Sequence, residues 1–119
     1  DVYKRQVFNY IPTFVATNST EALTNTSTAV SVSTAISTVD SSGGAVTVTL
    51  AAGVTGQLKT IICTTAGNNI TVTPAATVGS GTTVVLDAAG ESVQLLYTGT
   101  AWAAVATSSF ATNIATVIQ

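Results

Sequence analysis

The sequence contains several short segments in which apolar and polar side chains alternate with a period of two. The clearest is "AVTVTL", where Val46, Val48 and Leu50 face one way and Thr47 and Thr49 the other. This is the pattern of a β-strand with one buried face. No stretch shows a long amphipathic helical period, and turns rich in Gly, Asn and Ser separate the segments. The chain is therefore predicted to be all-β.

The longest strand-like region, "GQLKTIICTTAGNNITVTP", runs from Gly56 to Pro74. Its first part is apolar on both parities near the centre, which indicates a buried strand. "AGNN" is a strong turn signal because Gly and Asn tolerate positive φ. "ITVTP" then resumes the alternation until Pro74, which cannot donate to a ladder. The region is predicted to be a β-hairpin.

Further strands are predicted before and after this region. "AVSVSTAIS" places Val30, Val32 and Ile36 on one parity, as in a single half-buried strand. "TTVVLD" is a short strand, and "SVQLLYTGTAWAAVAT" is a late hairpin that contains Tyr97 and Trp102. The count of about seven strands predicts a single antiparallel β-sandwich or small barrel with an N-terminal arm. The tail "FATNIATVIQ" fits a strand and a short helix equally well.

Three segments resemble one another: "AVTVTLAAG", "NITVTPAAT" and "TTVVLDAAG". Their spacings of roughly 24 and 13 residues are unequal, which favours chance over a true repeat in a chain with so small an alphabet.

A length of 119 residues allows one domain and one core. Residues 1–6, "DVYKRQ", resemble a translated adapter scar of the kind that begins many metagenomic reading frames, and they are left out of the fold prediction. Residues 7–28 are interpreted as an N-terminal arm or edge segment, and residues 29–119 as the β domain. The arm has an aromatic start, Phe8, Tyr10 and Phe14, that needs a partner surface.

Only 7% of the residues are charged, and the formal net charge is -2. A protein that binds the nucleic-acid backbone needs clustered cations, so nucleic acid is not an expected partner. No apolar run approaches the ~18 residues of a membrane helix, so no membrane association is predicted. The polar surface must consist mainly of hydroxyl and amide groups.

Histidine is absent, which excludes Ser-His-Asp and Cys-His catalysis and zinc sites of the Cys/His type. Asp87 and Glu91 flank the "AAG" turn and are interpreted as solvated turn residues; a glycosidase-like pair and a calcium site are the functional alternatives. Cys63, between apolar neighbours, is predicted to be a small buried hydrophobe rather than a reactive thiol or intersubunit bridge. Lys59 is predicted to snorkel at the surface, although burial beside an acid and an Asn or Asp would permit an isopeptide bond. No catalytic residue and no cofactor is predicted.

The stretch from Gly56 to Ala106 resembles small virion structural proteins of tailed bacteriophages, especially marine ones. The shared features are "G-x-x-K-x-I", "I-T-V-T-P", "T-x-V-x-L", "G-E-S-V-Q-L-L-Y" and "G-T-x-W". The resemblance implies a non-enzymatic subunit that decorates the capsid or forms part of a head fibre, often as a homotrimer on the surface of the virion. Its partners would be further copies and the major capsid protein or other virion proteins. The resemblance does not extend to the N-terminal arm; from the residues themselves, Phe8, Tyr10 and Phe14 are the candidate docking segment. Tyr97 and Trp102 are expected to pack in the core or at a subunit interface, and they are the candidate trimer contact.

Two other function classes remain open from the sequence. A tail-fibre or receptor-binding module would present an exposed aromatic or polar pocket for a glycan. A bacterial surface adhesin or filament subunit, at the cell surface or outside the cell, would lack one strand of its own fold and take it from a neighbour. An enzyme is disfavoured because histidine is missing and acids are few.

Overall fold

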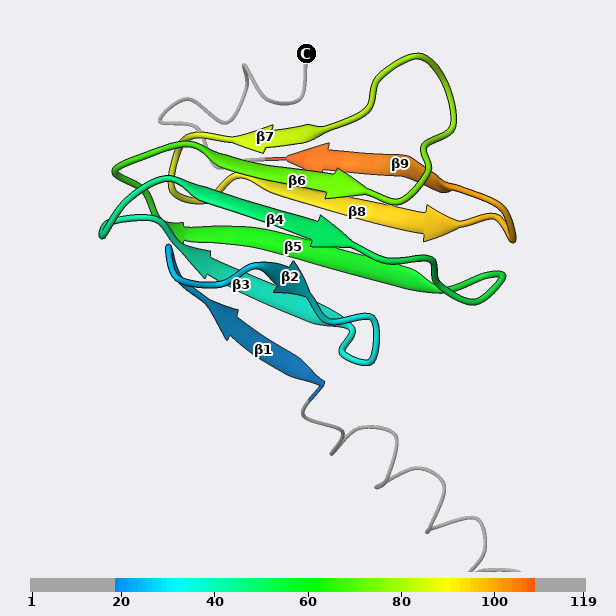
Figure 1. The fold of residues 1–119 in the computed structure, drawn as a ribbon, viewed down its shortest axis with the longest axis horizontal. Coiled ribbons are helices and arrows are strands. Elements are labelled where there is room, and N and C mark those ends of the chain that lie inside the picture. The colour runs from blue at the N-terminus through cyan, green and yellow to red at the C-terminus, as the bar shows by residue number, and fades with distance from the viewer. Residues whose placement is uncertain (1–18, 109–119) are drawn as a thin grey trace, which may run out of the picture.

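The computed structural model describes residues 19–108, which form nine β-strands in two sheets and contain no helix (Figure 1). Sheet A has the order β1 (Thr20–Leu23), β3 (Ile36–Asp40), β5 (Leu58–Thr65), β8 (Ser92–Tyr97) and β9 (Trp102–Ser108). Sheet B has the order β2 (Ala29–Val30), β4 (Val46–Leu50), β6 (Ile70–Pro74) and β7 (Val84–Leu86). The all-β prediction is confirmed. The prediction of a single antiparallel sandwich or barrel of about seven strands is wrong, because both sheets mix parallel and antiparallel pairs.

The first six strands alternate between the two sheets. Each strand therefore returns to its sheet in the same direction as the strand two places earlier, and the ladders β1–β3–β5 and β2–β4–β6 are parallel. Ile36 pairs with Thr60 and Val46 pairs with Ile70, 24 positions later in both cases. The chain thus winds as a coil around one core, as in solenoid folds built from stacked strand pairs.

The region Gly56 to Pro74 is not a hairpin, which corrects the prediction. β5 pairs with β3 and β8 in sheet A, whereas β6 pairs with β4 and β7 in sheet B. The "AGNN" turn carries the chain across the core, and it packs on the equivalent turn of the preceding coil. There the Ser41 hydroxyl donates to the backbone carbonyl of Asn68 at 2.7 Å, and the side-chain amide of Asn68 donates from Nδ2 to the backbone carbonyl of Ser41 at 2.9 Å. These contacts between turns replace a hairpin ladder.

The segment "AVSVSTAIS" is likewise not one strand. It contains β2, a crossing at residues 31–35, and the start of β3 in the other sheet. Val30 is buried, but Val32 is 36% exposed, and the buried parity of β3 is that of Ser37 and Val39. The period-2 pattern failed because the chain changes sheets in the middle of it.

Three antiparallel strands close the other side of the coil. β7 pairs with β6, β8 pairs with β5, and β9 pairs with β8 through the predicted late hairpin. At the opposite side, β1 is the edge of sheet A, and it lies within the predicted arm or edge segment at residues 7–28. The tail "FATNIATVIQ" lies outside the described residues.

One hydrophobic core fills the space between the two sheets. The predicted alternation of "AVTVTL" is confirmed, since Val46, Val48 and Leu50 are fully buried and the threonines between them are exposed. All of the remaining eight strands also contribute side chains to the core: Leu23, Val30, Val39, Ile61, Cys63, Ile70, Val72, Leu86, Val93, Leu95, Tyr97 and Trp102. Among residues 19–108, no helix qualifies as a membrane-spanning segment.

The three similar segments all lie in sheet B. "AVTVTL" and "ITVTP" pair side by side in parallel, with Thr47 opposite Thr71 and Thr49 opposite Thr73. Their spacing of 24 residues is therefore the length of one coil. The third segment follows at a shorter spacing because β7 turns back antiparallel to β6.

Candidate functional site

A polar cluster lies between the sheets at the start of β5, with Lys59 at its centre. Lys59 shares the parity of Ile61 and Cys63, so it points into the core and is completely buried. The prediction that it snorkels at the surface is wrong. The Lys59 side chain lies on the inward face of β5, and Thr34 and Glu21 supply the polar partners that its burial requires.

The Lys59 ammonium group is held by two kinds of contact. Its Nζ donates to the Thr34 carbonyl at 2.9 Å and to the Thr34 hydroxyl at 2.7 Å. It also lies 3.9 Å from Oε1 of Glu21. That same oxygen accepts from the Ser31 N–H at 2.7 Å and from the Ser37 hydroxyl at 2.6 Å. Three segments distant in sequence are thereby tied together around one buried charge.

Burial lowers the pKa of Lys59, and the Glu21 carboxylate opposes this shift by favouring the charged form. An isopeptide bond would need an Asn or Asp side chain beside the amine. The partners that the described residues supply to Nζ are instead Thr34 and Glu21, whose carboxylate is held by Ser31 and Ser37. The cluster is therefore suited to stabilising the fold, and this geometry gives no support to crosslinking with Asn or Asp.

Cys63 is a free, fully buried thiol on the inward face of β5, as predicted. Burial raises the pKa of the thiol, and the nearby carboxylates of Glu91 and Asp40 raise it further. Both effects disfavour the thiolate, which is the nucleophilic form. The side chain is thus a small core residue in a setting that suppresses thiol chemistry.

Asp87 and Glu91 flank the turn between β7 and β8, as predicted, and Glu91 closes it. Its Oε1 accepts from the backbone N–H groups of Asp87 at 2.7 Å and Ala88 at 3.1 Å. These bonds lower the pKa of Glu91. Within residues 19–108, no group of three or more His, Cys, Asp or Glu is placed to hold a metal ion. The role that the structure gives to Glu91 is that of a turn cap.

Tyr97 and Trp102 face each other across the late hairpin. Their rings pack edge to face with centroids 5.1 Å apart and an interplanar angle of 67°. Tyr97 is 8% exposed and Trp102 1%, and the Trp102 Nε1 donates to the Ala51 carbonyl at 2.9 Å. Core packing therefore occupies both side chains, which leaves little of either to touch another copy. Their contribution to a trimer contact stays a prediction, and Phe8, Tyr10 and Phe14 lie outside the described residues.

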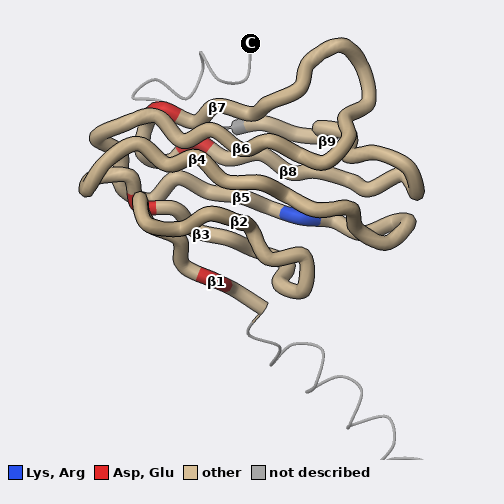
Figure 2. Tube along the Cα trace, viewed as in Figure 1, with Lys and Arg blue, Asp and Glu red and all other residues tan. Residues whose placement is uncertain are grey.

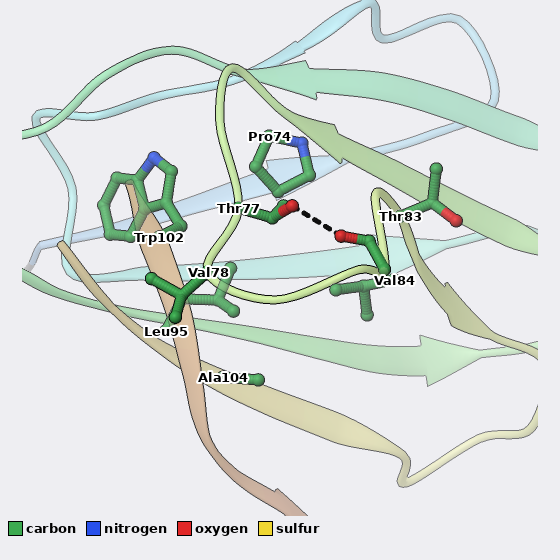
Figure 3. Close-up of a pocket in the computed structure, with 9 residues that line it drawn as sticks. Pro74, Thr77, Val78, Thr83, Val84, Leu95, Trp102 and Ala104 are labelled. Carbon is green, nitrogen blue, oxygen red and sulfur yellow. Dashed lines mark hydrogen bonds between the residues drawn. The ribbon is translucent and has the colours of Figure 1, made fainter. Parts of the chain in front are cut away.

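A pocket opens beside Trp102, where the long connection between β6 and β7 pairs with the first residue of β9 through a bridge between Thr77 and Trp102 (Figure 3). Nine residues line it: Pro74, Thr77, Val78, Gly81, Thr83, Val84, Leu95, Trp102 and Ala104. The connection is folded on itself by a hydrogen bond from the Thr77 hydroxyl to the Gly81 carbonyl. The volume is about 150 Å³, whereas sites for drug-sized ligands measure roughly 300–1,000 Å³. With an apolar lining and no charged group, this pocket fits at most a single apolar side chain or a group of that size.

Sequence reasoning missed Glu21, Thr34 and Ser37 as members of the polar cluster. Glu21 falls within the predicted arm, and the alternation of "AVSVSTAIS" puts Ser37 on the parity opposite to Val30 and Ile36, which is not the expected buried face. One feature of the sequence could have indicated the cluster: Lys59 lies two positions before the apolar Ile61 and therefore faces the same side of the strand. A cation on an inward face requires an acid from elsewhere in the chain.

No protein-family model matches this sequence, and a comparison with curated proteins gives no significant match.

Proposed function

We propose that this protein is a non-enzymatic structural subunit of a bacteriophage particle, of the head decoration or head-fibre type. The observation that carries the proposal is how the described reactive side chains are used. Lys59 and Glu21 pair inside the fold, and Cys63 is buried with a raised thiol pKa. The Glu91 carboxylate caps a turn, and Asp40 accepts from the backbone and hydroxyl of Ser42.

The resemblance to virion proteins supports the same function. Two of its segments fall on strands that build the core, and a third is the exposed turn that leads into the buried Trp102. "ITVTP" is β6, "GESVQLLY" contains β8, and "G-T-x-W" is the turn into β9. These segments specify packing, which is what a subunit of a repetitive assembly requires.

The coiled topology also favours a structural role. Parallel ladders of stacked strand pairs give an elongated unit in which each coil contacts its neighbours. With few charges on the surface, copies can approach one another without strong electrostatic repulsion. A receptor-binding module is less well supported, because the Tyr97 and Trp102 rings that could have formed an aromatic glycan platform are buried.

The proposal is tested by asking whether the protein is present in purified virions. Trypsin is a poor choice for mass spectrometry because the chain has only three Lys and Arg residues, and two of them lie within the first six positions. A protease that cleaves after aromatic residues and leucine should be used on density-purified particles from the source. Peptides recovered in stoichiometric ratio to the major capsid protein support the proposal. Recovery only in the cell-envelope fraction, or a pilus or secretion operon around the gene, contradicts it.

A further inference from the structure

Four connections gather at one end of the molecule, which we call the loop end. They are residues 31–35, 51–57, 75–83 and 98–101, which follow β2, β4, β6 and β8. Strand direction places them together, because β2, β4 and β6 run parallel and the chain leaves β8 at the side from which it enters β5. In Figure 1 they lie on the right.

The loop end is uncharged and exposes several large hydrophobic side chains among Ser, Thr, Ala and Gly residues. Six large hydrophobic side chains are exposed among the described residues, and four of them are in these connections or at the first residue of β5: Val32 (36%), Val54 (72%), Leu58 (49%) and Val78 (57%). None of the four connections contains a charged residue. At the opposite end lie Asp40, Asp87 and Glu91, and Figure 2 shows acidic positions on that side. The described part of the molecule therefore has one uncharged end with exposed valines and a leucine, and one acidic end.

The loop end is also held rigid by hydrogen bonds between its connections. The Gln57 side chain donates to the Val32 carbonyl at 2.6 Å and accepts from the Val54 N–H at 2.9 Å. Trp102 donates to the Ala51 carbonyl, and the Val78 N–H donates to the Trp102 carbonyl at 2.9 Å. Loops fixed in this way lose little conformational entropy when they bind, so the surface is preorganised for contact.

We propose that the loop end is a self-association surface, and that its partner is the loop end of further copies of this chain. The inference rests on the proposed function in that an assembling subunit needs such a contact. Charge disfavours a contact between two acidic ends, and a loop end placed against an acidic end would have to bury carboxylates. The acidic ends of two copies would bring three carboxylates against three with no described cation between them, which costs energy. Two loop ends meet without like charges, and burial of their valines and leucine favours the contact.

The test uses charged substitutions at exposed positions, where the fold tolerates change. Val54→Glu and Val78→Glu place a carboxylate on the loop end. Val85→Glu and Val105→Glu are the matched controls, because these valines are 51% and 49% exposed but lie in strands away from the loop end. Unfolding midpoints of all four variants establish that each one is folded.

Sedimentation velocity and light scattering across micromolar concentrations give the association constant. The full chain is expected to form oligomers. Every symmetric contact contains the substitution in both copies, so each loop-end variant should raise the dissociation constant by on the order of a hundredfold. The controls should stay within about threefold of the parent chain. The inference would be overturned if the parent chain remained monomeric at the highest concentration at which it is soluble, or if the controls dissociated as readily as the loop-end variants.

Failure here and failure of the proposed function are distinguishable. If the chain is found in virions but stays monomeric in solution, the virion role stands and the self-association surface is refuted. If it associates through the loop end but is absent from virions, the surface stands and the virion role is refuted.

Discussion

The buried Lys59–Glu21 pair yields the sharpest prediction about stability. Glu21→Gln removes the negative charge but keeps the size of the side chain and an oxygen that can accept from Ser31 and Ser37. Lys59, which is completely buried, is then left without its counter-charge. The substitution therefore isolates the electrostatic part of the cluster.

The expected cost follows from the geometry. Two unit charges about 4 Å apart attract by about 4 kcal/mol at an effective dielectric constant near 20, and removing one partner of a fully buried pair costs about 3–5 kcal/mol. Here the Glu21 side chain is 22% exposed, and the separation of 3.9 Å is longer than a hydrogen bond. We therefore expect a loss of about 2–3 kcal/mol, which lowers the melting temperature by roughly 10 °C or more in a domain of this size.

The matched perturbation is Lys59→Met, which removes the cation and keeps most of the apolar stem. It loses two hydrogen bonds to Thr34 but leaves Glu21 with two donors and access to water. A loss of about 1–2 kcal/mol is expected. In the double variant, Glu21→Gln should cost much less than it does alone, because no buried charge remains to be unpaired.

The assay is chemical unfolding followed by the fluorescence of Trp102, the only tryptophan and 1% exposed in the folded chain. Asp87→Asn, an exposed acid, is the control for removing one charge and should change stability by less than about 0.5 kcal/mol. The double-mutant cycle should give a coupling energy of about 1–2 kcal/mol. Losses that add within about 0.5 kcal/mol would refute the claim that the two charges stabilise each other.

The same pair predicts a pH dependence. Burial lowers the folded-state pKa of Lys59 below its ordinary value of 10.5, so the unfolded chain binds more protons at this site between the two values. Stability rises with pH wherever the unfolded state binds more protons. The difference in unfolding free energy between the parent chain and Lys59→Met should therefore increase in favour of the parent as the pH approaches 10.5. The comparison with Lys59→Met cancels the other alkaline titrations.

Three further predictions follow from the packing and the turns. Cys63→Ser should cost about 1–3 kcal/mol, because it buries a hydroxyl where an apolar thiol lies, and the parent thiol should resist modification until unfolding. Gly53→Ala should cost about 1–3 kcal/mol because its Cβ would lie 2.8 Å from Trp102 Cζ2, whereas Gly81→Ala, with nothing within 4 Å, should be neutral or stabilising; equal effects would contradict the packing there. The lowered pKa of Glu91 predicts that its contribution, present at neutral pH, is lost as the pH falls below its ordinary value of 4.5, so Glu91→Gln should flatten acid unfolding in that range.

Local sequence patterns predicted the buried face of β4 and the late hairpin, but they failed for "AVSVSTAIS", where the chain changes sheets. The alternation of Val46, Val48 and Leu50 and the late hairpin both depend on neighbouring residues, and both are confirmed. The sheet to which each strand belongs could not be predicted in this way. A four-residue turn such as "AGNN" can close a hairpin or cross the core, and the choice depends on the contact of Asn68 with Ser41, 27 positions earlier.

The polar cluster was missed for a related reason. The type of residue suggested that Lys59 is exposed, whereas its parity with Ile61 indicated that it is buried. Lys59 is nevertheless buried, because Glu21 of β1 and Thr34 of the β2–β3 connection supply the polar partners that make burial possible. Such partners are visible only once the topology brings β1 and β5 to either side of β3.

The position of Glu21 also bears on how the open side of the coil avoids unwanted strand addition. β1 is an edge strand of only four residues, and its glutamate points inward. Short edges and inward charges both protect a sheet from pairing with foreign strands. A peptide that displaced β1 without bringing an acid to this place would leave Lys59 buried and unpaired. Replacement of β1 by a foreign strand is therefore disfavoured unless that strand brings an acid to the same place.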